Sequence, residues 1–180
     1  MTLAAFAVAA TMNAQVYVGG GLGFETSSQD GNSTTAFKFL PEIGYNLDEN
    51  WAVGIVFGYS QTELNDDVDD EGKVQKVKNK KFQISPYARY TFLKLDKVNV
   101  FIDGGLDYIH ADNGGSKNNT FAIGVKPGVA VNLNDKLSFV SHFGWLGYKN
   151  SKDDYEGAKA VNTFGLNLDS NVSFGLYYNF

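Results

Sequence analysis

Residues 164–180 read FGLNLDSNVSFGLYYNF, and every second side chain from Phe164 onward is apolar or aromatic, with Ser170 as the one exception. The side chains between them are small or polar throughout. A period of two is typical of a β-strand with one apolar and one polar face. Strands of soluble domains usually have about 5–6 residues. The longer row at 164–180 predicts a strand that presents one face to lipid.

The same alternation recurs along the rest of the chain. It predicts eight strands, at about 15–26, 35–47, 51–61, 80–93, 98–111, 120–132, 136–148 and 164–180. The connections alternate between long and short, which indicates antiparallel neighbours with short turns at one end and long loops at the other. We therefore predict an all-β, eight-stranded antiparallel up-and-down transmembrane β-barrel. The last strand should pair with the first to close it, because lipid does not tolerate unpaired strand edges.

The composition excludes several other classes of protein. The 180 residues include no cysteine, so disulfides, thiolate metal sites and a lipid anchor on cysteine are excluded. A net charge of −5 does not indicate nucleic-acid binding. The mean hydropathy of −0.22 carries no weight, because alternating polar and apolar residues average to near zero.

The first 14 residues, MTLAAFAVAATMNA, differ from the rest of the chain. Their apolar run at 3–10 has the length of a signal-peptide core and is too short to span a bilayer as a helix. We expect a signal peptide at 1–14, with Ala14 before the cleavage site, and a barrel over 15–180. No Lys or Arg precedes the run, which points to a true start upstream of Met1. A frayed N-terminal segment is the alternative.

The two faces of the predicted strands carry different side chains. The apolar row is uncharged in every strand, whereas the other row holds Gly, Ala, Ser and isolated charges. A lipocalin-like barrel would place its apolar row inside; the sparse charge here favours a polar row in a narrow lumen filled by side chains. Charges there must pair, because an unpaired buried charge costs several kcal/mol. We expect a plugging ion-pair network formed by Lys38, Glu42, Arg89, Asp103, Asp107 and Lys126.

Aromatic residues of the apolar row gather at two heights. Two girdles separated by aliphatic residues match the two interfaces of a bilayer. The expected girdle residues are Tyr45, Trp51 and Phe92 near the short turns, and Tyr59, Tyr108 and Trp145 near the long loops.

The chain ends on a recognisable pattern. Ser173, Gly175, Tyr178 and Phe180 resemble the C-terminal insertion signal of outer-membrane proteins, which ends on two aromatic residues separated by one position. With the signal-like start and the eight strands, the chain resembles the small outer-membrane β-barrel family, which includes the transmembrane domain of outer membrane protein A and outer membrane protein X.

The resemblance implies a location and a set of partners. It places the chain as a multi-pass barrel in the outer membrane of a Gram-negative bacterium, with extracellular loops and periplasmic termini. It also implies contact with outer-membrane lipid and lipopolysaccharide and recognition of the last strand by the barrel assembly machinery. We expect a monomer without a nucleic-acid partner.

The stretch 63–81 is the most unusual local feature, because acidic residues precede Gly72 and lysines follow it. Extended strands would place the two arms opposite each other as a solvated hairpin. A divalent-cation site and contact with lipopolysaccharide or a partner are alternatives. Asp67, Asp69 and Gly72 echo a calcium loop, but Lys78 stands where an EF-hand needs its closing Glu.

Two histidines are the remaining candidates for chemistry. His142 falls on the lumen row and His110 at the outer rim, and no G-x-S-x-G nucleophile motif is present. We expect no catalytic, cofactor or metal site. The predicted function is a non-enzymatic barrel with a plugged lumen that contributes to envelope integrity or surface interaction. A narrow channel or small-ligand-binding barrel is the alternative, and a lipid-modifying enzyme is a lesser one.

Overall fold

The computed structural model describes residues 15–29, 32–68, 74–155, 157–167 and 173–180. The expected signal peptide at 1–14 lies outside these ranges. The described strands are β1 (Val16–Gln29), β2 (Asn32–Asn46), β3 (Trp51–Val68), β4 (Val74–Lys94), β5 (Val98–Asn113), β6 (Ser116–Asn132), β7 (Leu137–His142), β8 (Trp145–Asp153), β9 (Val161–Asn167) and β10 (Ser173–Asn179). Within this part of the chain, no helix is long and apolar enough to cross a membrane.

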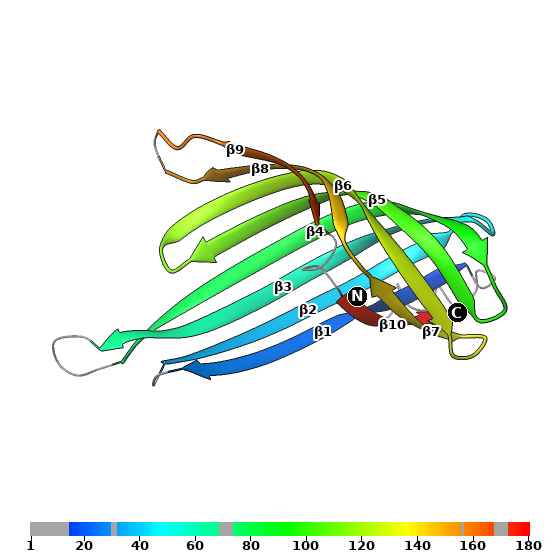
Figure 1. The fold of residues 1–180 in the computed structure, drawn as a ribbon, viewed down its shortest axis with the longest axis horizontal. Coiled ribbons are helices and arrows are strands. Elements are labelled where there is room, and N and C mark those ends of the chain that lie inside the picture. The colour runs from blue at the N-terminus through cyan, green and yellow to red at the C-terminus, as the bar shows by residue number, and fades with distance from the viewer. Residues whose placement is uncertain (1–14, 30–31, 69–73, 156, 168–172) are drawn as a thin grey trace, which may run out of the picture.

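The ten strands make eight passes around one antiparallel barrel (Figure 1). Consecutive strands from β1 to β7 pair with each other, and β10 pairs with both β7 and β1. The pairing of β10 with β1 runs from Tyr17 opposite Asn179 to Gly20 opposite Leu176. The predicted eight-stranded closed barrel is confirmed, and the first and last passes close it.

One predicted strand is interrupted. The pass expected at 136–148 divides into β7 and β8 at Gly144, whose φ of 77° lies in the left-handed region that favours glycine. The prediction of one continuous strand there is wrong. The pass expected at 164–180 is described as β9 and β10, and residues 168–172 between them lie outside the described part.

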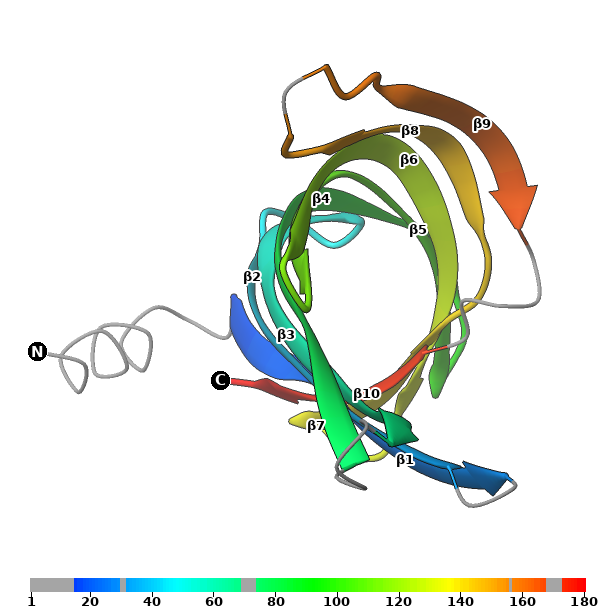
Figure 2. The same cartoon turned by 90° about the vertical axis from the view of Figure 1, so that its left-hand side faces the viewer.

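β9, the first part of the last pass, does not pair with β1. β9 pairs with β8, and no described strand pairs with its other side. On that same side, β1 has no described strand partner beyond Gly20. Figure 2 shows β9 and β1 on different sides of the barrel opening. We call this unpaired line between Gly21–Gln29 and Val161–Asn167 the seam.

The connections at one end are shorter than predicted, because the strands are longer. β3 and β4 stay paired as far as Val68 opposite Val74, and β5 and β6 as far as Asn113 opposite Ser116. The loops expected at 62–79 and 112–119 are therefore largely paired strand. We call this the hairpin end, and the end with the β2–β3, β4–β5 and β6–β7 connections the short-turn end.

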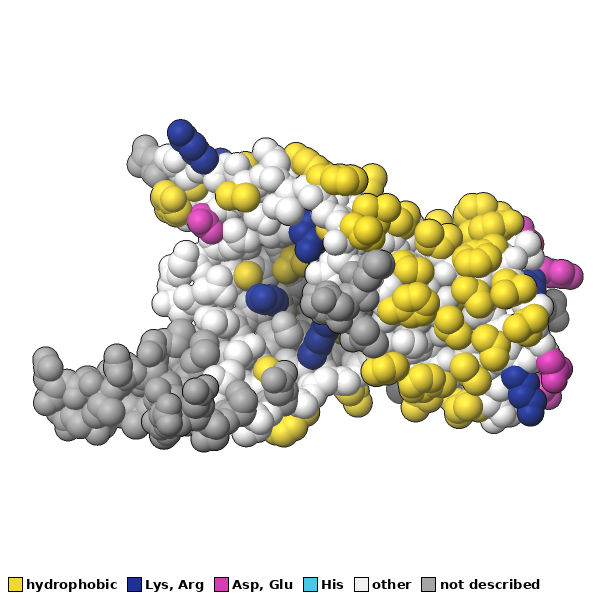
Figure 3. All heavy atoms as spheres, in the orientation of Figure 1, with side chains coloured by type: hydrophobic (Ala, Val, Ile, Leu, Met, Phe, Trp, Pro, Cys, Tyr) yellow, Lys and Arg dark blue, Asp and Glu magenta, His cyan; other side chains and the backbone are white. Residues whose placement is uncertain are grey.

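The outward face of the barrel is apolar over one membrane-crossing length. On β3 the outward row runs from Trp51 to Tyr59, about the 9–11 residues that a tilted strand needs to cross a bilayer. Toward the hairpin end, polar residues such as Lys80 and Lys78 are exposed instead. Figure 3 shows hydrophobic side chains covering the short-turn half on the face in view. The polar row faces the lumen, and the site described below is built from it.

Candidate functional site

The short-turn half of the lumen is filled by aromatic rings that lie against glycines. A Cβ atom added at any of these glycines would overlap a ring from a neighbouring strand. Their lack of a side chain therefore makes the room that the rings occupy. The pairs are Gly44 with Tyr17, Gly54 with Tyr87, Gly128 with Phe101 and Gly19 with Tyr177.

Arg89 lies at the centre of these rings. Its Nε donates to Asp103 Oδ1 at 2.7 Å and its terminal NH2 to Asp103 Oδ2 at 2.8 Å, a bidentate geometry. An oxygen of Glu42 lies 3.8 Å from the same terminal nitrogen. All three residues are buried, with exposed fractions of 6–8%. One cation therefore holds two carboxylates across the lumen.

Two tyrosines provide the hydrogen bonds of the second carboxylate, Glu42. Tyr87 and Tyr177 donate their hydroxyls to the two oxygens of Glu42, the latter at 2.6 Å. Because the Tyr87 proton is directed at Glu42, the Tyr17 hydroxyl donates to the Tyr87 oxygen. This chain of donors satisfies both oxygens of Glu42 beside a single arginine.

Phe101 and His142 complete the cluster. The Arg89 guanidinium carbon lies 3.9 Å from the centre of the Phe101 ring, a cation–π distance, and Phe101 is 1% exposed. His142 meets Phe101 edge-on at 5.3 Å, and its Nε2 lies 2.8 Å from Asp103. We call this cluster the plug; it comprises Tyr17, Glu42, Tyr87, Arg89, Phe101, Asp103, His142 and Tyr177.

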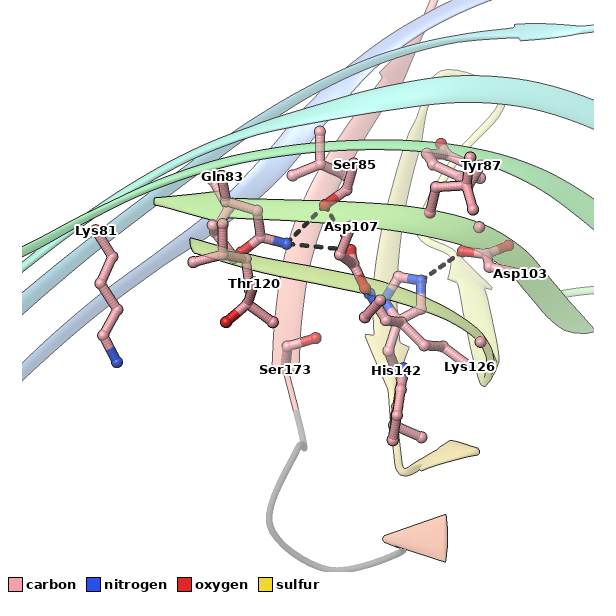
Figure 4. A pocket seen from close by; sticks show the side chains of 18 of the residues that line it. Lys81, Gln83, Ser85, Tyr87, Asp103, Asp107, Thr120, Lys126, His142 and Ser173 are labelled. Carbon is pink, nitrogen blue, oxygen red and sulfur yellow. Dashed lines mark hydrogen bonds and ion pairs between the residues drawn. The ribbon is translucent and has the colours of Figure 1, made fainter. Parts of the chain in front are cut away.

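A smaller polar group stands on the hairpin side of the plug. Lys126 lies 3.2 Å from both oxygens of Asp107. Ser85 donates to Asp107 at 2.5 Å, and Gln83 approaches it at 3.4 Å (Figure 4). The six residues expected as one network thus form two groups, and Lys38 has no ion pair with any side chain that the structure describes.

Above the plug the lumen widens into a cavity of about 620 Å³. Its floor includes His142 and Tyr177, and its walls carry Lys38, Lys81 and Lys149. Figure 3 shows cationic side chains within this hollow at the hairpin end. The lumen therefore has a closed half and an open half.

Trp145 lines this cavity and is only 6% exposed, so its expected place in an outward girdle is wrong. Outward side chains alternate as far as Phe143, after which Leu146 and Tyr148 point outward instead. The one-residue slip at Gly144 moves every following side chain to the opposite face. It also brings Lys149 inward, where its ammonium lies 4.4 Å from the centre of the Trp145 ring.

The other girdle residues lie on the outer wall at two heights. Trp51 packs against Tyr90 at 4.8 Å, and Phe92 is 58% exposed on the same side. Tyr45 donates to Gln15 at the short-turn end. Nearer the hairpin end, aromatic contacts join Tyr59 to Phe82 and Tyr108 to Phe121.

The C-terminal signal residues are spread over both faces of β10 and its end. Ser173 and Gly175 face the lumen and line the cavity, whereas Tyr178 is exposed on the outer wall. Phe180 follows β10; its amide donates to Val16 at 3.1 Å and its ring meets Tyr178 edge-on at 5.2 Å.

The plug tyrosines and Phe101 were not predicted as site residues. A signal was present, because Tyr17, Tyr87 and Tyr177 stand on the polar row and Phe101 interrupts it. For 63–81, Glu63 is opposite Lys78 and forms an ion pair with it at 3.8 Å. The side chains of Asp67 and Asp69, like Gly72, lie outside what the structure describes. Among the side chains that are described, no group of three metal-ligating residues occurs.

Comparisons with known proteins agree with this geometry. A family model described as "Outer membrane protein beta-barrel domain" matches residues 1–180. OprG from Pseudomonas aeruginosa has a similar structure, with a TM-score of 0.55, 13% identity and coverage of 93% of this chain and 96% of that chain. A major outer membrane protein from Thermus thermophilus is also similar, with a TM-score of 0.54, 15% identity and coverage of 93% of this chain and 100% of that chain. No curated protein matches the sequence. At these identities the structural likenesses show the fold alone.

Proposed function

Because the chain belongs to the outer membrane protein β-barrel domain family, we propose that it is a non-enzymatic, monomeric outer-membrane barrel that does not conduct. It contributes to envelope integrity or surface interaction through its hairpin end. The hairpin end faces the cell exterior, and both termini face the periplasm. The observation that carries this proposal is the plug. Its charged groups are paired across a lumen that an eight-stranded barrel already makes narrow.

Conductance tests the plug directly. The purified barrel in planar bilayers should show no stable openings. A triple variant, Tyr17→Ala with Tyr87→Ala and Tyr177→Ala, removes three rings without removing a charge and should introduce ion-sized openings. Leu106→Ala, on the exposed outer wall, is the control and should stay silent. Stable openings of the unaltered protein would overturn the proposal.

The proposed orientation is testable because the chain has no cysteine. Ser116→Cys is a near-isosteric change at the exposed hairpin end, and Asp135→Cys lies in an exposed short turn. A membrane-impermeant maleimide applied to whole cells should label position 116 and leave position 135 unlabelled. Labelling of position 135 alone would reverse the orientation.

The proposed contribution to the envelope is tested by deletion of the gene. Cells without it should admit more of a large antibiotic that the intact outer membrane excludes. Complementation with a protein whose β3–β4 hairpin is shortened separates the two roles. If the shortened protein restores exclusion of the antibiotic, the barrel wall provides the envelope integrity. If it does not restore exclusion, the hairpin is required. Unchanged exclusion together with unchanged surface adhesion in the deletion strain would contradict both.

Recognition of the last strand by the assembly machinery is the proposed role of the C-terminal residues. Deletion of Phe180 should lower the assembled fraction in cells more than Phe92→Ala, although Phe92 is the more exposed ring. Heat-modifiable migration of membrane fractions measures that fraction. Equal losses would show that only burial matters.

A further inference from the structure

We propose that the cavity above the plug is a binding site for a hydroxyl-bearing phosphate ester. Four lysines from four different strands line it: Lys38 on β2, Lys81 on β4, Lys126 on β6 and Lys149 on β8. Strands remote in sequence thus place their cations around one enclosed space. This proposal does not depend on whether the barrel conducts.

Three of the four cavity lysines lack an ion pair with a carboxylate that the structure describes; the exception is Lys126, which lies 3.2 Å from Asp107. The charged groups that act most on Lys38 are themselves cations, Lys126 and Lys81. Four like charges converging in a partly enclosed space repel each other, and an anion bound between them would relieve that repulsion.

The plug supplies only part of the negative charge that would balance these lysines. Asp103 and Glu42 also line the cavity, but both are within ion-pair distance of Arg89, and Glu42 accepts two tyrosine hydroxyls. The third lining carboxylate, Asp107, is paired with Lys126. Counted with Arg89, the cations around the cavity still outnumber these carboxylates, so an anion there would meet a net positive charge.

The remaining walls indicate what the anion carries. Amide and hydroxyl groups of Gln83, Thr120 and Ser151 line the cavity and can bond to ligand hydroxyls. Trp145 adds an aromatic wall suited to a ring with apolar edges. A volume of about 620 Å³ lies within the usual range of small-molecule pockets, roughly 300–1,000 Å³. A phosphorylated sugar or a phosphorylated lipid headgroup has this chemistry.

Trp145 provides a reporter for binding. The chain has two tryptophans, and Trp51→Phe leaves Trp145 as the only one. Because Lys149 lies over its ring, a phosphate that draws Lys149 away changes the fluorescence. Titration of the detergent-purified Trp51→Phe protein with glucose 1-phosphate and with pyrophosphate should give saturable changes. Sodium chloride at equal ionic strength should not.

The lysine variants assign the site. Lys38→Met combined with Lys81→Met should weaken binding of both probes at least tenfold. Lys80→Met is the matched control: it removes the same charge from the same strand on the outer face, where Lys80 is exposed, and should change affinity less than twofold. No saturable change in the unaltered barrel, or equal affinities of the double variant and the control, would overturn the proposal.

Bilayers distinguish the two sources of phosphate. If the natural ligand is a lipid headgroup, phosphatidylglycerol in nanodiscs would compete with pyrophosphate. Pyrophosphate would then bind more weakly than in phosphatidylcholine nanodiscs. This difference should disappear in the Lys38→Met, Lys81→Met variant. Equal affinities in the two lipids would assign the site to a soluble phosphate ester. Either result supports the shared chemistry, provided that the double variant has lost binding.

Discussion

The two halves of the lumen share one wall but differ in how their charges are arranged. In the short-turn half, Arg89 is shared by Asp103 and Glu42, and rings fill the space around it. In the hairpin half, Lys38 and Lys81 have no carboxylate of the described residues within ion-pair distance, and the space around them is open. The first half is built as a core, whereas the second half resembles a pocket that lacks its counter-charge.

The comparison shows that a barrel wall alone does not decide what its interior does. Both halves have the alternation of a membrane barrel. Their difference comes from the size and charge of the inward side chains, because rings opposite glycines close the lumen and lysines opposite small polar residues leave it open. Substitutions of the same kind in the two halves should therefore have unequal effects.

Removal of one cation from each half should show the largest difference. Arg89→Met leaves Asp103 and Glu42 buried without their cation and should destabilise the barrel by about 3–5 kcal/mol. Lys81→Met removes a repelling charge and should leave stability within about 0.5 kcal/mol or raise it. Urea titration of the refolded barrel in lipid vesicles measures both. Equal losses would mean that the cavity lysines are as well compensated as Arg89.

Filling the space beside a plug ring should have the next largest effect. Gly44→Ala places a methyl group against the Tyr17 ring and should cost roughly 1–3 kcal/mol by overpacking. Gly165→Ala is the matched control on β9, where a Cβ has nothing within 4 Å. The same urea titration applies. If both variants lose equal stability, strand propensity rather than ring contact is responsible.

Two ion pairs of the same length differ in their burial and in the number of further contacts that their cations make. Arg89–Glu42 and Lys78–Glu63 are both 3.8 Å apart, but the first is buried and the second is largely exposed on the β3–β4 hairpin. Lys78→Met should therefore cost less than about 0.5 kcal/mol. Stability measured in low and high salt should show a small, screened difference between this variant and the unaltered protein. A loss as large as that of Arg89→Met would refute the contrast.

The smallest effect concerns a short turn outside the bilayer. Hydrogen bonds from the backbone amides of Asn50 and Trp51 lower the pKa of Asp48 below its ordinary value of 3.8. The stabilisation is complete above that value and is lost as the pH falls through the lowered pKa.

Asp48→Asn should remove this acid dependence while keeping the turn. Asn134 makes the same two backbone contacts in the β6–β7 turn without titrating. Unfolding as a function of pH, compared between Asp48→Asn and the unaltered protein, measures the difference. Parallel pH profiles would show that Asp48 does not contribute.

The fold followed from the sequence because alternation records which side chains share a face. It does not record where the phase changes. The alternation predicts Trp145 on the outer wall, because Phe143 and Trp145 continue one apolar row in the sequence. The left-handed Gly144 between them shifts the alternation by one residue, so Trp145 faces the lumen. The new outward pair, Leu146 and Tyr148, is the signal in the sequence that reveals the slip.

The candidate site was predictable only in part. Charges on the polar row had to be inward, but their partners depend on the stagger between strands that are distant in sequence. The register places Arg89 opposite Asp103 and Asp103 opposite Lys126, although Lys126 bonds to Asp107 instead. The emptiness of the cavity depends on side-chain volumes summed over several strands, which no single stretch of sequence displays.

The seam bears on how deeply the barrel lies in the membrane. Along it, β1 and β9 turn backbone amides and carbonyls toward no described strand, and such groups cost several kcal/mol each in hydrocarbon. Yet Leu22 and Phe24 on β1 and Phe164 on β9 present more than 70% of their surface outward and favour lipid. For the described residues of the seam, a position at the boundary between hydrocarbon and headgroups would satisfy both demands.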